Sequence, residues 1–341
     1  MKSVRFHEHG GPEVLRYEEA PDPEPGPGDA LVRVRACALN HLDVWERRGL
    51  EHVTIPLPHV SGSDVAGEVV SSSARVMPAG QRVMLQPGIS CGHCLACLSG
   101  RDNECPSYEV LGYGRHPGGY AELVKVPAQN LVPIPDHVTF ADAAAFPLTF
   151  VTAWHMLVTR ARVARGDDVL VLAAGSGVGQ AAVQIARLHG ARVFATAGSD
   201  AKLEQARALG AAGVIHHHRQ DIAEEIKRLT NRRGVDVVIE HVGDATWTKS
   251  IRSLARGGRL VTCGATTGYH GTIDLRALFS KQLSILGSYM GTKGELLRAA
   301  AFFFNGQMKP IVDARYPLAE AAAAQRRLEE SGQFGKIVLD V

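Results

Sequence analysis

The sequence lacks an excess of charge of either sign, because 37 lysines and arginines nearly balance 35 aspartates and glutamates. A chain with a net charge of +2 has no basic surface that attracts nucleic acid or an anionic membrane, so neither is expected as a partner. Long apolar runs are missing as well, since none reaches the roughly 18–20 residues that span a bilayer. The first residues, Met1–His7, contain no apolar segment typical of a secretory signal. The sequence therefore predicts a cytoplasmic protein.

The length of 341 residues and the 45% hydrophobic content favour two domains of an ordinary globular protein. The first third predicts short strands separated by turns, at residues 14–18, 30–38, 63–70, 81–85 and 119–126. The proline-rich stretch Pro21–Gly28 cannot enter a sheet interior. Residues 141–160 predict one or two helices with a break at Pro147.

From Asp168 onward, predicted strands alternate with predicted helices. The strands are expected at residues 168–173, 191–196, 213–217, 235–240, 259–263 and 284–289, with helices at 178–189, 200–209, 221–231 and 245–254. Such alternation implies a parallel, doubly wound sheet, and hence an α/β fold. Residues 291–341 predict two helices and a last strand with no core of their own, so they are expected to complete the N-terminal domain.

A glycine-dense turn, Ala174-Gly-Ser-Gly-Val-Gly179, separates the first of these strands from its helix. The turn fits a dinucleotide-binding unit, in which backbone N–H groups and a helix N-terminus approach a pyrophosphate. The match to Gly-x-Gly-x-x-Gly is imperfect, since Ala174 and Ser176 occupy the first two glycine places. An ordinary tight turn is the alternative. The candidate cofactor contacts here are Gly175, Ser176, Gly177, Val178 and Gly179.

Four cysteines follow the spacing C-x₂-C-x₂-C-x₇-C, at Cys91, Cys94, Cys97 and Cys105. Four thiolates can close around one tetrahedral Zn²⁺, and such a site has no open position, so it would be structural. A disulfide framework and an iron–sulfur cluster are the alternatives, the first of them disfavoured in a cytoplasmic chain. We interpret His93 as a bystander, while Cys37 and Cys263 stand alone.

These features together resemble the medium-chain dehydrogenase/reductase superfamily over nearly the whole chain. The likeness includes His9-Gly-Gly-Pro-Glu-Val14, Gly118-Gly-Tyr-Ala-Glu122, Thr149-Phe-Val-Thr-Ala-Trp154 and Gly257-Gly-Arg-Leu-Val-Thr-Cys-Gly264. The resemblance implies a GroES-like, β-rich catalytic domain formed by residues 1–149 and 290–341, with a zinc lobe at 88–108, and a Rossmann domain at 150–289. It also implies a homodimer through the sheet edge near Ser284–Tyr289, or a homotetramer.

Two branches of this superfamily compete for the substrate site. The zinc alcohol dehydrogenases hold a catalytic zinc with a Cys, a Gly-His-Glu motif and a second Cys, and here those places read Cys37, Gly62-Ser63-Asp64 and about Leu148. Serine and leucine are not zinc ligands, so at most Cys37 and Asp64 remain, unless His41 or His59 substitutes. Asn40-His-Leu-Asp43 and Arg47-Arg-Gly49 instead resemble the quinone oxidoreductase branch, which works without catalytic zinc.

The resemblance therefore implies an NAD(P)(H)-dependent oxidoreductase that moves a hydride between a nicotinamide and a carbonyl, quinone or enone. Asn40 is the candidate hydrogen-bond donor to the substrate oxygen, His41 a candidate proton donor, and Thr152 resembles a threonine that packs against the nicotinamide. The pocket is expected to be built in part from a loop at Asn40–Gly49. A zinc-dependent alcohol dehydrogenase with unusual ligands and a non-catalytic NADPH-binding protein are the rival hypotheses.

The preferred coenzyme follows from the end of the second strand of the cofactor domain. NAD enzymes place an acidic residue there, but this sequence has Ala197, and Asp200 is interpreted as a first-turn residue behind a Ser199 N-cap. A 2′-phosphate would then be held by Ser199, Lys202 and His217, although Lys202 is equally compatible with a solvated helix face. We expect NADP(H), with NAD(H) as the alternative, and Gly264 as a further cofactor contact.

Overall fold

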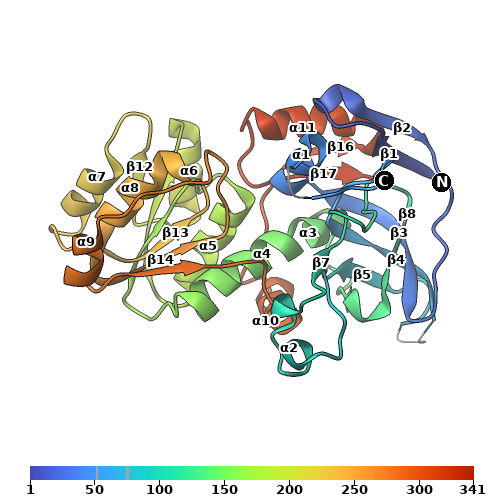
Figure 1. Ribbon diagram of the computed structural model, residues 1–341, viewed down its shortest axis with the longest axis horizontal. Coiled ribbons are helices and arrows are strands. Elements are labelled where there is room, and N and C mark those ends of the chain that lie inside the picture. The colour runs from blue at the N-terminus through green and yellow to red at the C-terminus, as the bar shows by residue number, and fades with distance from the viewer. Residues whose placement is uncertain (51–52, 74–76) are drawn as a thin grey trace. The chain divides into compact units, whose positions relative to one another are not determined.

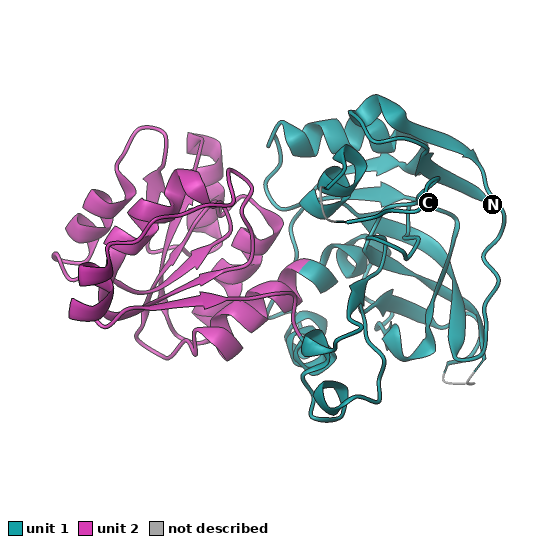
Figure 2. Ribbon diagram, viewed as in Figure 1, with its two compact units in different colours: residues 1–148, 292–341 teal, residues 149–291 magenta. Residues whose placement is uncertain are grey.

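The computed structural model describes residues 1–50, 53–73 and 77–341, which form two compact units (Figure 2). Unit 1 consists of Met1–Leu148 and Thr292–Val341, and unit 2 of Thr149–Gly291. The expected domain bounds differ from these by at most two residues.

Unit 1 is built on a mostly antiparallel sheet (Figure 1). In spatial order its strands are β16 (Val312–Pro317), β17 (Lys336–Asp340), β3 (Asp29–Ala38), β4 (Asp64–Ser72), β5 (Arg82–Leu85) and β9 (Leu131–Pro133), and β8 (Leu123–Pro127) also pairs with β3. Two small sheets pair β1 (Lys2–Phe6) with β2 (Leu15–Glu19) and β6 (Gly88–Ile89) with β7 (Glu109–Val110). Because β17 lies beside β3, the C-terminal segment completes this sheet.

The helices of unit 1 are short. They are α1 (His41–Arg48), α2 (Leu95–Leu98), α3 (Phe140–Ala145), α10 (Lys293–Phe304) and α11 (Ala321–Glu329), while α4 (Pro147–Trp154) crosses into unit 2. Single 3-10 turns occur at Pro12–Val14, Asp102–Glu104, Ala128–Asn130 and Leu318–Glu320. No helix among the described residues is long and apolar enough to cross a membrane.

A buried arginine joins α1 to the C-terminal helix α11. Arg47 has no exposed surface, and its guanidinium donates to Gln325 at 2.7 Å, to Glu329 at 2.6 Å and to the carbonyl oxygen of Gly10 at 2.7 Å. A guanidinium can be buried only when its donors are satisfied in this way. The Arg-x-Gly motif therefore has a structural role in holding three chain segments together.

One local expectation was wrong. The segment Asn40–Gly49 is a helix and not a loop, because the Asp43 carboxylate accepts from the N–H of Asn40 at 2.9 Å and caps a helix that is too polar to show a clear period. The predicted break at Pro147 is confirmed, because the region 141–160 divides into α3 and α4, which begins at Pro147. A π-helical turn at His155–Arg160, which was not predicted, follows α4.

Unit 2 contains the expected doubly wound parallel sheet. Its spatial order is β12 (Gly213–His216), β11 (Arg192–Ala197), β10 (Asp168–Val171), β13 (Val235–Glu240), β14 (Leu254–Thr262) and β15 (Ser284–Gly287). The helices are α5 (Gly177–Leu188), α6 (Asp200–Ala208), α7 (Ile222–Leu229), α8 (Asp244–Ser253) and α9 (Leu275–Ser280). The chain moves outward from β10 through β11 to β12 and then resumes at β13, so the strand order reverses between β10 and β13.

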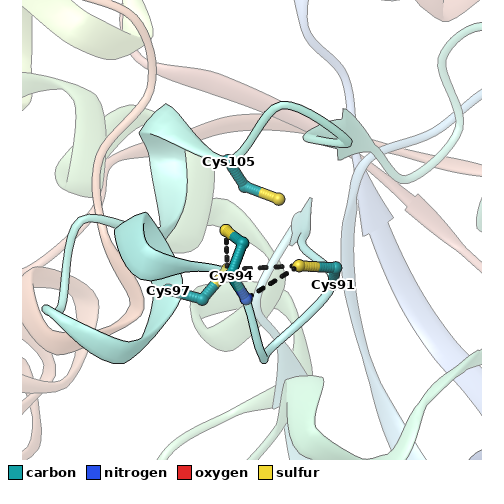
Figure 3. A group of neighbouring side chains, drawn as sticks. All are labelled: Cys91, Cys94, Cys97 and Cys105. Carbon is teal, nitrogen blue, oxygen red and sulfur yellow. Dashed lines mark hydrogen bonds between the residues drawn. The ribbon is translucent and has the colours of Figure 1, made fainter.

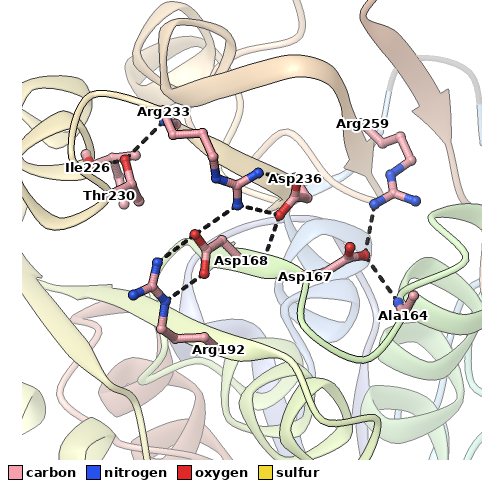
Figure 4. Close-up of polar contacts among 10 residues, drawn as sticks. Ala164, Asp167, Asp168, Arg192, Ile226, Thr230, Arg233, Asp236 and Arg259 are labelled. Atoms are coloured by element: carbon pink, nitrogen blue, oxygen red, sulfur yellow. Dashed lines mark hydrogen bonds and ion pairs between the residues drawn. The ribbon is translucent and has the colours of Figure 1, made fainter.

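A network of ion pairs connects the amino ends of neighbouring strands in this sheet (Figure 4). Asp168, at the start of β10, accepts from both Arg192 at 2.6 and 2.7 Å and from Arg233 at 2.9 Å, and its side chain is only 4% exposed. Arg233 also pairs with Asp236 of β13 at 2.7 Å. These contacts fix the relative positions of β10, β11 and β13 at their amino ends, opposite the carboxyl ends.

Candidate functional site

The glycine turn of unit 2 ends at the N-terminus of α5. Ser176 is the N-cap, and its Oγ accepts from the N–H of Gly179 at 2.8 Å. A Cβ at position 179 would lie 2.3 Å from the carbonyl oxygen of Ala173, so the close approach of turn and helix requires glycine. Residues 175–178 are half-buried, which leaves the turn and its N–H groups open to an anion.

A histidine that the sequence prediction did not include lies beside this turn. His241 directly follows β13, and its Nε2 is 2.9 Å from Ser176 Oγ. Gly264 lies at its other side, where a Cβ would be 3.2 Å from the carbonyl oxygen of His241. The structure therefore brings together the carboxyl ends of β10, β13 and β14 at the candidate cofactor contacts Ser176 and Gly264.

The second strand, β11, ends without an acidic residue. Ser199 caps α6, because its Oγ accepts from the N–H of Lys202 at 3.4 Å, which confirms the predicted N-cap. Asp200 is exposed in the first turn and pairs with Arg219 at 3.0 Å. The one carboxylate near the end of this strand is thus already paired with a guanidinium.

Basic side chains gather around His217. Burial and the neighbouring positive groups lower the pKa of His217 to about 4, and those neighbours are His218, His216, Lys249 and Lys202. The rings of His217 and His218 cover Gly198, where a Cβ would lie 3.0 and 2.9 Å from their Nε2 atoms. The predicted contacts Lys202 and His217 are therefore neighbours, and their surroundings favour an anion over a cation.

In unit 1, Asn40 is part of a buried group with Asp64 and Lys336. The ammonium of Lys336 donates to Asn40 Oδ1 at 2.6 Å and to Asp64 Oδ2 at 2.8 Å. Asn40 Nδ2 donates to the same carboxylate oxygen at 2.9 Å, and Asp64 Oδ1 accepts from the N–H of Leu148 at 2.8 Å. Asp64 has no exposed surface, and Lys336 is 3% exposed.

These contacts fix the orientation of the Asn40 amide. A lysine can only donate and an ionised carboxylate can only accept, so Oδ1 has to face Lys336 and Nδ2 has to face Asp64. One N–H of Nδ2 remains available to another acceptor. Because its oxygen accepts from a cation, the amide is also polarised toward stronger donation.

A second buried carboxyl lies under α1. Asp43 Oδ2 accepts from the Tyr120 hydroxyl at 2.9 Å and from the N–H of Asn40, while Oδ1 has no hydrogen-bond partner in the described structure. Burial raises the pKa of Asp43 to about 7, although both donors lower it. Asp43 is therefore a carboxyl that exchanges a proton near neutral pH and also supports the backbone of Asn40.

The other two predicted catalytic residues, His41 and Thr152, lie on different helices. His41 is the first residue of α1 and is half-buried, with its ring 6.3 Å from that of Trp45. Thr152 lies on α4 in unit 2, is 5% exposed, and its Oγ1 has no hydrogen-bond partner in the described structure.

The candidate ligands of a catalytic zinc do not converge. Cys37 belongs to the hydrophobic core of unit 1, and burial and the nearby Asp43 and Asp64 raise the pKa of its thiol well above the usual value. His59 Nε2 lies 3.0 Å from Glu46 Oε1. Within residues 1–50, 53–73 and 77–341, the one group of three or more potential ligands that gathers around a point is the cysteine cluster.

The four Sγ atoms of that cluster, from Cys91, Cys94, Cys97 and Cys105, all lie within 4.8 Å of one another (Figure 3). The Cys94–Cys97 and Cys91–Cys97 separations are 3.5 and 3.9 Å, close to the edge of about 3.8 Å that a tetrahedron with Zn–S bonds of 2.3 Å requires. The arrangement fits a tetrahedral metal ion.

The backbone around the cluster favours thiolates. The N–H groups of His93 and Cys94 lower the pKa of Cys91 to about 6, and the N–H of Ser107 donates to Cys105 Sγ at 3.4 Å. Thiolates are the form that binds Zn²⁺. The His93 ring is exposed and lies with Nδ1 2.8 Å from the carbonyl oxygen of Cys91, so it is not a member of the ligand group.

Sequence reasoning missed Lys336 and His241. A lysine inside the apolar run Phe334–Leu339 was a signal for Lys336, because lysine is almost never fully buried unless it is paired. A polar residue directly after the buried strand Val235–Glu240 was a signal for His241, since ligands of parallel sheets bind at the carboxyl ends of strands.

Comparison with known families and structures agrees with this arrangement. The family described as "Alcohol dehydrogenase GroES-like domain" matches residues 26–136, and the family described as "Zinc-binding dehydrogenase" matches residues 177–305. The chain is 32% identical to a quinone oxidoreductase of Pongo abelii, over 99% of this chain and 97% of the relative. It is also 32% identical to a crotonyl-CoA reductase of Streptomyces collinus, over 95% of this chain and 80% of the relative.

A solved structure described as an NAD-dependent alcohol dehydrogenase is 48% identical, covers both chains completely and has a TM-score of 0.96. The names of these relatives indicate different substrates, and all three name oxidoreductases. The chain therefore belongs to the medium-chain dehydrogenase/reductase superfamily and is an NAD(P)-dependent oxidoreductase of that superfamily.

Proposed function

We propose that the protein transfers a hydride between NADP(H) and a carbonyl, quinone or enone, with a structural zinc and without a catalytic one. The observation that carries the proposal is the buried group of Asp64, Lys336 and Asn40, in which an ammonium neutralises the carboxylate of the Gly-Ser-Asp motif. The similarity to quinone oxidoreductases and to a crotonyl-CoA reductase supports the substrate classes.

The charge of Lys336 disfavours a metal ion on Asp64. A divalent cation bound to this carboxylate would lie about 4 Å from the ammonium, and their repulsion would be about 8 kcal/mol at an effective dielectric constant of 20. Nearby thiolate or imidazole ligands would have to offset that energy. Cys37 lies in the hydrophobic core and His59 beside Glu46, which supports a mechanism without a catalytic metal.

When bound, the nicotinamide supplies or accepts the hydride, and the residues of this chain orient and polarise the substrate. The free N–H of Asn40 Nδ2 donates to the substrate oxygen, where negative charge develops, and Lys336 strengthens this donor. His41 supplies or removes the proton. The unpartnered hydroxyl of Thr152 is available to the nicotinamide.

The surroundings of β11 support NADP(H). A 2′-phosphate meets no carboxylate at Ala197, and Asp200 is paired with Arg219. Ser199, Lys202 and His217 hold the phosphate, and their proximity to Lys249 adds positive charge. Since a structure with 48% identity is described as NAD-dependent, turnover has to be measured with both NADPH and NADH.

The cysteine cluster binds one zinc ion per chain, which holds the lobe of residues 88–108 and takes no part in the reaction. None of the six cysteines forms a disulfide, which fits a reducing compartment such as the cytoplasm. Strand β15 forms one edge of the sheet of unit 2, and pairing of this edge with the same edge of a second copy would form a homodimer. A homotetramer is the alternative assembly.

The decisive experiment combines metal analysis with turnover. We expect one zinc per chain and oxidation of NADPH, faster than of NADH, with at least one member of a panel of ketones, quinones and enones. Two zinc ions per chain would support the rival alcohol dehydrogenase hypothesis. Tight NADPH binding without turnover on any member would support the non-catalytic one.

A further inference from the structure

Ser176 and His241 meet at the point where the strand order of unit 2 reverses. Ser176 follows β10 and His241 follows β13, and these two strands are parallel neighbours from which the chain proceeds in opposite directions. Dinucleotides bind in the crevice at such a point. The hydrogen bond of 2.9 Å between Ser176 Oγ and His241 Nε2 therefore crosses the floor of the coenzyme site.

The unpaired nitrogen of His241 indicates its tautomer. Nδ1 is buried and has no hydrogen-bond partner among the described residues. A buried N–H without an acceptor is rarer in proteins than a buried acceptor without a donor. The proton therefore belongs on Nε2, and Nε2–H donates to Ser176 Oγ. Burial lowers the pKa of His241, although Glu240 raises it, which favours the neutral ring.

This tautomer determines what the Ser176 hydroxyl can do. A hydroxyl has two acceptor lone pairs and one proton. The N–H of Gly179 occupies one lone pair, at 2.8 Å, and Nε2–H of His241 occupies the other. The hydroxyl proton is then left to an acceptor outside this pair. At the positive N-terminus of α5, the acceptor that fits is a phosphate oxygen.

We propose that His241 is a positioning residue for the coenzyme, which commits the Ser176 hydroxyl to donate to a pyrophosphate oxygen of the bound nicotinamide dinucleotide. The inference rests on the proposed function only in requiring that a dinucleotide binds at this turn. It holds for NAD(H) and NADP(H) alike, because both contain the pyrophosphate.

The test measures dissociation constants for three ligands: NADPH, ADP-ribose, which keeps the pyrophosphate but lacks the nicotinamide, and 2′-AMP, which lacks the pyrophosphate. The His241→Leu variant should bind NADPH and ADP-ribose about 10-fold more weakly, the loss expected for one hydrogen bond to a charged group, and 2′-AMP unchanged. The His241→Gln variant places an N–H near the same position and should bind NADPH within about threefold of the wild type.

A double-mutant cycle distinguishes an effect of His241 that acts through Ser176 from a general disturbance of the coenzyme site. The Ser176→Ala variant should bind NADPH at least as weakly as His241→Leu, and the double variant should bind no more weakly than Ser176→Ala. Lys202→Met is the matched control, since it should leave ADP-ribose binding unchanged. Additive losses in the cycle, or equal weakening of 2′-AMP by His241→Leu, would overturn the inference.

One measurement needs no variant. Long-range ¹H–¹⁵N correlation spectra of the wild-type protein report the tautomer of His241, and the inference requires the proton on Nε2. A proton on Nδ1 overturns it. If the wild type binds none of NADPH, NADH and ADP-ribose, then the proposed function itself fails. If the wild type binds them and the His241 variants bind them equally well, only the inference about His241 fails.

Discussion

Replacing Lys336 by methionine removes a buried cation while it keeps most of the side-chain volume. The ammonium lies 2.8 Å from Asp64 Oδ2 and 2.6 Å from Asn40 Oδ1. At an effective dielectric constant of 20, the attraction to Asp64 is about 6 kcal/mol before the cost of removing both ions from water. Loss of one member of a buried pair typically costs about 3–5 kcal/mol, and we expect the free energy of unfolding to fall by that amount.

The double variant Lys336→Met/Asp64→Asn distinguishes stability from turnover. It leaves no unpaired charge at positions 64 and 336, so most of the lost free energy of unfolding should return, as measured by urea denaturation. The rate should not return, because Asn40 still lacks its polarising cation. We expect kcat/KM at saturating NADPH to stay about 10²-fold below the wild type in both variants, the usual cost of weakening one donor to a developing oxyanion.

Two results would refute this reasoning. If the double variant regains the wild-type kcat/KM together with its stability, then Lys336 acts only as a structural counter-ion. If the single variant loses less than about 1 kcal/mol, the pair behaves as a solvated surface contact and not as the buried pair that the structure contains.

Three further predictions concern the zinc, the coenzyme and the sheet of unit 2. Removal of zinc by a chelator should lower the temperature of unfolding before it lowers kcat at 25 °C; an immediate loss of kcat with unchanged unfolding would contradict a structural role. The variant Lys202→Met should raise KM for NADPH about 10-fold and leave KM for NADH nearly unchanged, whereas equal effects on both would argue against a 2′-phosphate site. Burial raises the pKa of Asp168, but the hydrogen bonds from Arg192 and Arg233 outweigh this and lower it. Asp168→Asn should therefore cost about 2–4 kcal/mol at pH 7, with kcat unchanged, and the difference from the wild type should shrink as the pH falls below 3.8, which calorimetry across pH can check.

The sheet of unit 2 was predictable because its strands are buried on both faces. In the sequence β10 and β13 are short apolar runs between helices, and their predicted ends agree with the structure to within two residues. The helix α1 was not predictable from periodicity, since four of its eight residues are charged and its buried members include Asp43, Glu46 and Arg47. Its stability depends on tertiary partners such as Gln325 and Glu329, which lie 278 and 282 residues from Arg47 in the chain.

The proposed catalytic group was partly visible in the sequence, as two separate residues that the fold brings together. The first was a carboxylate, Asp64, in a motif where Ser63 and Leu148 stand in place of the expected imidazole and thiolate. The other was a lysine inside the apolar strand β17. A buried charge needs a partner of opposite sign, so neither Asp64 nor Lys336 could be explained from the sequence without the other. Strand β17 lies beside β3, and β3 beside β4, which places Lys336 and Asp64 two strands apart. We therefore interpret the absence of zinc ligands from this motif and the presence of the lysine as one feature, because the lysine supplies the positive charge that this carboxylate requires.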